Sequence, residues 1–115
     1  NLRLLQGNKH PNRNHREGDL LFQNEDEIVH IEIQNNHHSQ MHLRMCQYYT
    51  DILFLYEEYK VSQYMVYIGK EKCYMKSQIK RDKMNYSYDI IDIEKIHKGD
   101  FTIILVINKK EEIMK

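Results

Sequence analysis

The chain has 115 residues, is 41% hydrophobic, and carries 17 basic and 17 acidic side chains, so its formal net charge is zero. This length suits one domain, and the balance of apolar and charged residues argues against disorder along the whole chain. No apolar run approaches the roughly 20 residues that a membrane-spanning helix needs. The chain has no overall excess of basic residues, which would have indicated general nucleic-acid binding. We therefore predict a single domain over 1–115 that does not enter a membrane.

The cysteines and the start of the sequence favour a cytoplasmic protein. Cys46 and Cys73 do not form a CxxC pair, and no charged segment followed by an apolar one opens the chain. Two distant cysteines without a secretory signal are typical of reducing compartments.

The first part of the chain predicts a β-hairpin after a polar lead-in. Turn-forming residues are frequent in 1–15, which we expect to be irregular. Segments 17–23 and 28–34 read as two strands joined by a polar turn at 24–27. In the second strand the residues alternate between the two faces, so that one face is apolar and the other holds His30, Glu32 and Gln34.

The rest of the sequence predicts a long helix and further strands. Apolar residues recur at three- and four-residue steps from 40 to about 59, which indicates a helix with Ser39 as its N-cap. Segments 61–68 and 86–93 read as strands, and a lysine-rich segment at 70–83 lies between them. The pattern at 101–107 fits a strand or a helix. A hairpin followed by a helix and another strand predicts an α/β fold, a mixed sheet with a long crossover helix.

Three side chains in the predicted hairpin form the candidate chemical site. Asp19 begins the first strand, whereas Glu32 and Gln34 share one face of the second. Two converging carboxylates repel each other unless a cation lies between them. Mg²⁺ prefers such oxygen ligands and retains positions for water and phosphate oxygens. The pattern therefore indicates a site for Mg²⁺ or Mn²⁺ if the two acids approach across the hairpin.

Longer stretches of the sequence resemble a known family. The string EGDLLF at 17–22 followed by IEIQ at 31–34 resembles the D…ExK core of the PD-(D/E)XK nuclease superfamily, with Gln34 in place of lysine. IVHIEIQ, the Met41-x-x-Arg44-x-x-x-Tyr48 spacing and the segment 61–69 together resemble the Rpn-type recombination-promoting nucleases and putative transposases. This resemblance covers about residues 16–93.

The resemblance implies a restriction-endonuclease-like core and a set of site residues. By position, Asp19, Glu32 and Gln34 would be catalytic, and Asp19, Glu32 and the backbone carbonyl of Ile33 would bind the metal. Gln34 could hydrogen-bond a water but carries no positive charge. The resemblance also implies that Arg44 and Tyr48, which lie one turn apart on the helix, contact DNA. From charge alone, Lys70 and Lys72 of the lysine-rich segment, and Arg16 near Asp19, are further DNA-binding candidates.

The implied function is metal-dependent DNA endonuclease activity in transposition or recombination. The partner would be DNA, and pairing of related nucleases makes a homodimer an open alternative. The superfamily core begins with a helix that 1–15 does not supply, so we expect this chain to lack the first helix and to be a fragment of a longer protein.

Two other functions remain open from the sequence. One is a catalytically inactive relic of the same fold that acts as a DNA-binding or interaction module. The other is a zinc site, because His38 and His42 are four residues apart at a helix start. No HExxH motif supports the zinc interpretation, and neither cysteine is near in sequence.

Overall fold

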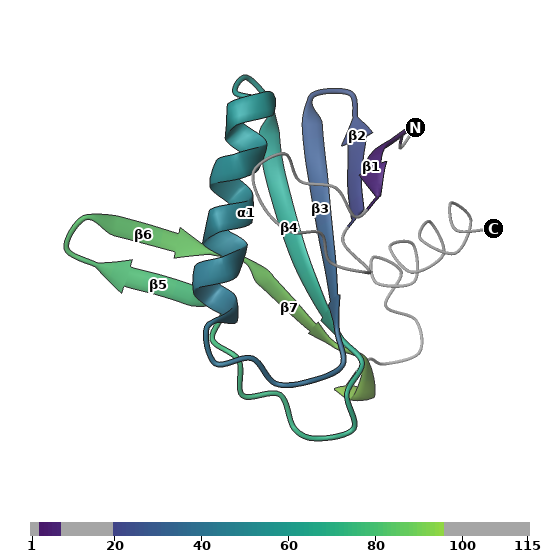
Figure 1. The fold of residues 1–115 in the computed structure, drawn as a ribbon, viewed down its shortest axis with the longest axis vertical. Coiled ribbons are helices and arrows are strands. Elements are labelled where there is room, and N and C mark those ends of the chain that lie inside the picture. The colour runs from purple at the N-terminus through teal and green to yellow at the C-terminus, as the bar shows by residue number, and fades with distance from the viewer. Residues whose placement is uncertain (1–2, 8–19, 96–115) are drawn as a thin grey trace.

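A five-stranded sheet with one helix packed on it dominates the computed structural model, which describes residues 3–7 and 20–95 (Figure 1). In chain order its elements are β1 (Arg3–Gly7), β2 (Leu20–Asn24), β3 (Glu27–Gln34), α1 (Met41–Leu55), β4 (Lys60–Tyr67) and β7 (Asp89–Asp92). The strand order is β1-β2-β3-β4-β7. The pairs β1–β2 and β2–β3 are antiparallel, and β3–β4 and β4–β7 are parallel. The predicted mixed α/β fold is confirmed, and segment 101–107 lies outside the described residues.

The predicted hairpin is formed by β2 and β3. Leu20 pairs with Ile31, and Asn24 pairs with Glu27, which leaves a two-residue turn. Glu25 has a φ of 52°. This left-handed conformation suits tight hairpin turns, although it strains a residue that has a Cβ.

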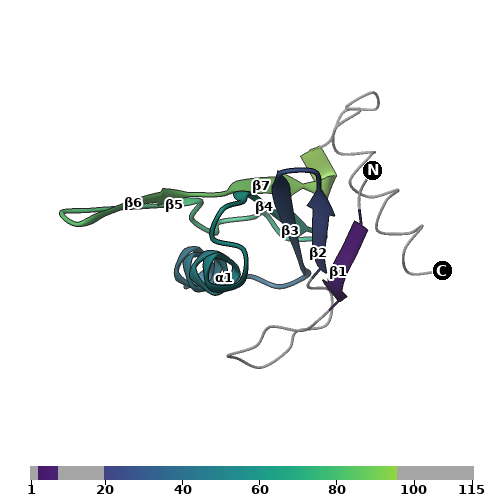
Figure 2. The same cartoon turned by 90° about the horizontal axis from the view of Figure 1, so that it is seen from above.

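Helix α1 connects two parallel strands and covers one face of the sheet (Figures 1 and 2). Its buried side chains are Met41, Met45, Tyr48 and Ile52, which follow the predicted stripe. The helix ends at Leu55, earlier than expected, and Tyr56 donates its backbone N–H to the carbonyl of Ile52. Glu57 and Glu58 come next, and negative charge is unfavourable at a helix C-terminus. Ser39 is not the N-cap; Gln40 occupies that position without a side-chain cap.

The predicted strand at 86–93 is divided between two sheets. Its first part lies in β6 (Met84–Ser87), which pairs with β5 (Gln78–Arg81), and its second part forms β7 beside β4. Tyr88 separates them, and its buried hydroxyl donates to the carbonyl of Lys76 at 2.5 Å. The chain then ends its described part in a short 3-10 helix at Ile93–Lys95. The hairpin β5–β6 therefore projects beyond the main sheet (Figure 2).

The prediction that 1–15 is irregular was wrong for residues 3–7, which form strand β1. Residues 3–7 pair with β2 in an antiparallel register that shifts between Leu4 and Gln6. Without β1, the backbone edge of β2 would be left unpaired. The sequence did not indicate this short strand, because its two adjacent leucines, Leu4 and Leu5, show no alternation and turn-forming residues follow from Gly7 onward.

Both faces of the sheet are buried, and they differ in composition. The face opposite α1 has an apolar cluster of Leu20, Phe22, Ile31, Val66 and Ile91. The face under α1 carries Leu21, Ile28, Met65 and Tyr67 together with the buried polar side chains His30, Glu32 and Gln63. The polar face of β3 is thus covered by the helix.

Candidate active site

Glu32 lies in the interior, in the second half of β3. Its side chain has no solvent exposure, and Gln34 Nε2 donates to its Oε1 at 2.9 Å. This contact confirms that Glu32 and Gln34 share a face. The other carboxylate oxygen, Oε2, has no hydrogen-bond partner among the described residues and lies 3.8 Å from His30 Nε2. Burial of an incompletely paired carboxylate is costly, so this oxygen is a strong candidate ligand for a cation.

His30 is held by residues that the sequence did not single out. Gln63, which lies opposite His30 in the β3–β4 register, points its amide nitrogen at His30 Nδ1 at 3.0 Å and at the carbonyl of Met45 at 2.9 Å. Tyr86 donates its hydroxyl to Gln63 Oε1 at 2.6 Å. Burial raises the pKa of Tyr86, so its hydroxyl remains a donor at neutral pH.

This network assigns the hydrogen on the imidazole of His30. Because Gln63 Oε1 accepts from Tyr86, its amide nitrogen is the atom that faces His30. An amide nitrogen only donates, so Nδ1 is the acceptor and the neutral ring carries its hydrogen on Nε2. That hydrogen is on the side of Glu32. The network therefore presents a hydrogen-bond donor to the buried carboxylate.

Arg44 and Tyr48 pair on the inner side of α1, as their spacing predicted. Arg44 Nη2 donates to the Tyr48 hydroxyl at 2.7 Å, and its guanidinium lies 5.8 Å from the centroid of that ring. Tyr48 is fully buried and packs edge-on against His30, with the ring centroids 5.1 Å apart. Arg44 Nη1 has no hydrogen-bond partner in the described part of the chain. The pair thus extends the polar cluster of β3 toward the N-terminus of α1.

Lys70 lies at the carboxyl ends of β3 and β4. It lines a polar hollow with Asn35, Asn36, His37, Tyr67 and Glu71. The chain segments after β3 and β4 remain close together here, because the N–H of Ile68 donates to the carbonyl of Gln34 at 2.8 Å, and a Cβ on Gly69 would lie 2.6 Å from the carbonyl oxygen of Asn35. Lys72 is exposed, and its Nζ lies 5.4 Å from the centroid of the Tyr74 ring.

The remaining sequence-predicted residues have different outcomes. Asp19 and Arg16 lie outside the described residues. The side chain of Ile33 packs against the apolar cluster, on the face away from Glu32. Among the described residues, no three His, Cys, Asp or Glu side chains are grouped closely enough to hold a metal.

The zinc alternative gains no support within the described ranges. His38 Nδ1 accepts a hydrogen bond from the backbone N–H of Gln40 at 3.1 Å. Burial, together with the positive charge of Lys76, lowers the pKa of His42. His38 thus has a local structural role at the start of α1, whereas His42 Nδ1 is buried without a hydrogen-bond partner among the described residues.

The comparisons with known proteins give no family. No protein-family model matches the chain, and neither a curated protein nor a solved structure matches it. In the described part of the chain, no helix is both long and apolar enough to cross a membrane.

Proposed function

We propose that this chain is a metal-dependent DNA endonuclease with a restriction-endonuclease-like core. The observation that carries the proposal is Glu32, a fully buried carboxylate with one oxygen that has no hydrogen-bond partner among the described residues. It lies next to Nε2 of His30, which carries the ring hydrogen, and close to the carboxyl ends of two parallel strands. Ligands of open α/β sheets commonly bind outside the carboxyl ends of their strands.

Asp19 would supply the second carboxylate of the site. Leu20, the residue after Asp19, pairs with Ile31, the residue before Glu32. A hard divalent cation fits the chemistry of Glu32, because it prefers carboxylate oxygens, and Oε2 is the oxygen not engaged by Gln34. When bound, such a cation would offset negative charge on the phosphate under attack.

The chain's own side chains would bind and orient the substrate. Gln34 holds Glu32 Oε1 and would orient a water molecule with its amide. Arg44 retains an N–H group without a partner among the described residues and would donate to a phosphate oxygen. Lys70, Lys72 and Arg16 would contact the DNA backbone farther from the reacting phosphate. By the resemblance of the sequence, this activity would serve transposition or recombination.

A specific observation favours the second candidate, an inactive DNA-binding or interaction module. The Gln34 amide already occupies Glu32 Oε1, where the superfamily has a lysine. Gln34 adds no positive charge that would favour the transition state over the bound substrate. In this alternative the polar cluster persists as a structural network without turnover.

A nicking experiment with isosteric variants tests the proposal. Supercoiled plasmid is incubated with Mg²⁺ or Mn²⁺ and with wild type, Glu32→Gln, Asp19→Asn or the control Glu25→Gln. Glu25 is an exposed acid in the turn of the same hairpin, so its replacement leaves the interior unchanged. We expect nicking by wild type and by the control, and its loss in the two site variants.

The other outcomes are equally decisive. Equal nicking by all four proteins would overturn the assigned site. Absence of nicking together with absence of Mn²⁺ binding, measured by electron paramagnetic resonance, would favour the inactive module.

A further inference from the structure

The outer side of α1 carries a stripe of side chains that the proposed chemistry does not use. Leu43, Gln47, Thr50, Phe54 and Glu57 recur at steps of three and four residues, and all are exposed. Leu43 is 43% and Phe54 is 78% exposed. A recurrence of 3.5 residues is the spacing at which one helix packs along another. The stripe therefore lies along one line of the helix, with the apolar side chains Leu43 and Phe54 on either side of Thr50.

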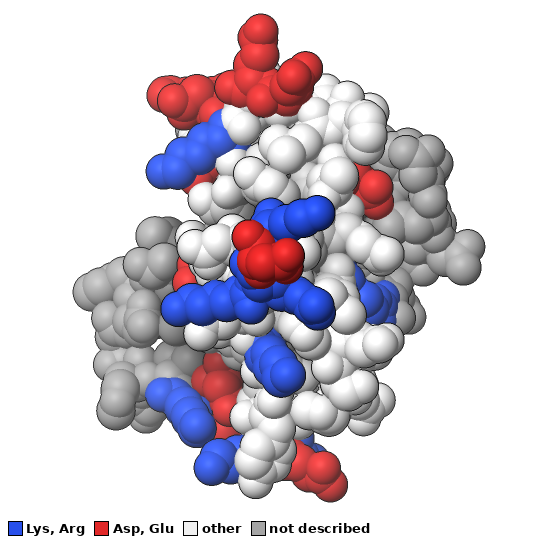
Figure 3. All heavy atoms as spheres, turned by 90° about the vertical axis from the view of Figure 1, so that its left-hand side faces the viewer, with Lys and Arg blue, Asp and Glu red and all other residues white. Residues whose placement is uncertain are grey.

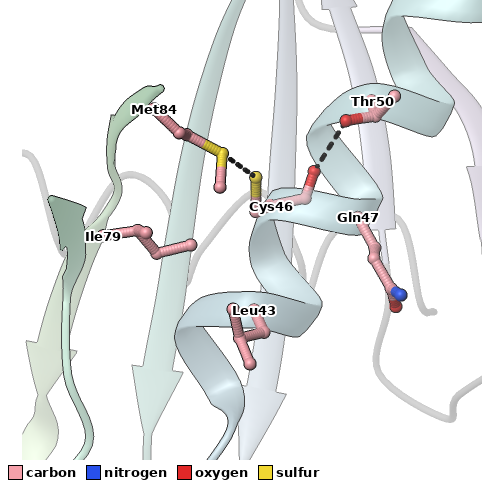
Figure 4. A pocket seen from close by; sticks show the side chains of 6 residues that line it. All are labelled: Leu43, Cys46, Gln47, Thr50, Ile79 and Met84. Carbon is pink, nitrogen blue, oxygen red and sulfur yellow. Dashed lines mark hydrogen bonds between the residues drawn. The ribbon is translucent and has the colours of Figure 1, made fainter. Parts of the chain in front are cut away.

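Two hollows follow this stripe and meet at one residue. The first lies between α1 and the hairpin β5–β6 and is lined by Leu43, Cys46, Gln47, Thr50, Ile79 and Met84 (Figure 4). Two of these lining residues touch each other across the hollow, because Cys46 Sγ lies 3.6 Å from Met84 Sδ. The second is lined by Thr50, Leu53, Phe54 and Glu57. Thr50 is common to both, and its hydroxyl is turned back to the carbonyl of Cys46.

Acidic and basic side chains are unevenly distributed on this side of the molecule. Figure 3 shows acidic side chains gathered at one end of this view, basic side chains across its middle around an acidic one, and both signs together at the other end. Glu57 and Glu58 follow the C-terminal end of α1, where both are exposed. The basic side chains of the hairpin region are Lys76, Lys80, Arg81 and Lys83, with Asp82 the single acid among them.

We propose that this face binds a second copy of the chain, with the two α1 helices antiparallel and the two-fold axis at Thr50. Phe54 follows Thr50 by four residues, and Cys46 precedes it by four. The axis therefore places Phe54 of each copy over the hollow beside Cys46 of the other. Thr50 is small enough to let the helices approach at the crossing point. The dimer is independent of the proposed metal chemistry.

Charge complementarity favours a second copy of the chain as the partner of this face. The same rotation places Glu57 of one copy opposite Leu43 of the other. Leu43 shares its hollow with Ile79 and Met84, the chain neighbours of Lys80 and Lys83, so Glu57 and Glu58 come toward the basic hairpin. An isologous interface needs one surface that complements itself in this way. The net charge of zero means that two copies do not repel each other overall.

Sedimentation velocity at micromolar concentrations tests the interface. We expect a dimer for wild type and a monomer for Phe54→Glu, which introduces a charge into the apolar hollow of the other copy. Tyr74→Glu is the matched control, because Tyr74 is 70% exposed but lies outside the stripe, and it should remain dimeric. Circular dichroism verifies that each variant is folded. A monomeric wild type, or a dimeric Phe54→Glu variant, would overturn the proposal.

Two further variants test the register of the helices. In a Cys46→Ser, Cys73→Ser background, Thr50→Cys should form an intermolecular disulfide on mild oxidation, whereas Tyr74→Cys should not. Reversing Glu57 and Glu58 to lysine should weaken the dimer at least about tenfold, and reversing Lys80 and Lys83 to glutamate in the same chain should restore it. Absence of the Thr50→Cys crosslink, or absence of this restoration, contradicts the proposed antiparallel register.

Discussion

The two faces of strand β3 perform different tasks although the same eight residues supply both. On the face away from α1, Ile31 packs with Leu20, Phe22 and other apolar side chains. On the face under α1, His30 and Glu32 are just as deeply buried, but they need hydrogen-bond partners from β4 and from Gln34. An apolar side chain at these positions would avoid the cost of desolvating polar groups.

This difference shows that stability alone does not account for the polar side chains on the helix-covered face. A sheet buried on both faces is stable with apolar residues on each. The helix-covered face instead contains a carboxylate, an imidazole and an amide in one connected cluster. Perturbed and buried polar groups gather at functional sites, so the composition of this face supports a functional assignment there and a structural one on the other face.

The largest effect is expected on the apolar face. Replacing Phe22 with alanine removes a fully buried aromatic ring and should lower the free energy of unfolding by about 3–5 kcal/mol. Urea unfolding followed by circular dichroism measures this loss. Tyr74→Ala, at an exposed position, should change the stability by less than about 0.5 kcal/mol. If Phe22→Ala costs under about 1 kcal/mol, the apolar face does not hold the fold as described.

A smaller loss is expected on the polar face, with a different signature. Gln63→Leu keeps the side-chain volume similar but leaves His30 Nδ1, the Met45 carbonyl and the Tyr86 hydroxyl without their partner. Each buried group left unpaired costs about 1–3 kcal/mol, part of which water recovers, so we expect a loss of about 2–3 kcal/mol. Unfolding in urea measures it.

The double variant separates this effect from a simple change of packing. Adding Tyr86→Phe to Gln63→Leu removes one of the unpaired groups, so the double variant should be more stable than Gln63→Leu alone. Met65→Leu is the packing control on the same strand and should cost under about 1.5 kcal/mol. Additive losses in the double variant would mean that Gln63 acts through packing.

Much of this fold could be predicted from sequence because its strongest patterns are local. The strict alternation in 28–34 indicated β3, and the spacing of Met41, Met45, Tyr48 and Ile52 indicated α1. The same regularity predicted that Glu32 and Gln34 share a face and that Arg44 meets Tyr48, and hydrogen bonds confirm both contacts. These are contacts over two and four residues, which backbone geometry alone determines.

The rest depended on contacts between distant segments. Gln63 bonds to residues 18 and 33 positions away, so nothing near it in sequence marked its role. Alternation showed that β3 has a polar face, but it could not show that α1 covers that face. Strand β1 likewise depends on its pairing with β2, and the break at Tyr88 depends on the contact of its hydroxyl with the carbonyl of Lys76. The roles of Asp19 and the metal stay predictions.

The smallest expected effect is on the pH dependence of stability, which should differ between the two faces. The apolar cluster opposite α1 has no group that titrates near neutral pH. On the helix side, burial and then the charge of Lys76 lower the pKa of His42 from its ordinary value of 6.5. The unfolded chain therefore binds this proton more tightly, so the stability from neutral His42 is complete above its ordinary pKa and declines as the pH falls toward its lowered pKa. His42→Gln should flatten the decline in the urea midpoint between about pH 7.5 and 5, a window around the ordinary histidine pKa. Lys76→Gln should flatten it partly, because it removes only the second cause. An unchanged slope in His42→Gln would assign the acid sensitivity to other groups under α1.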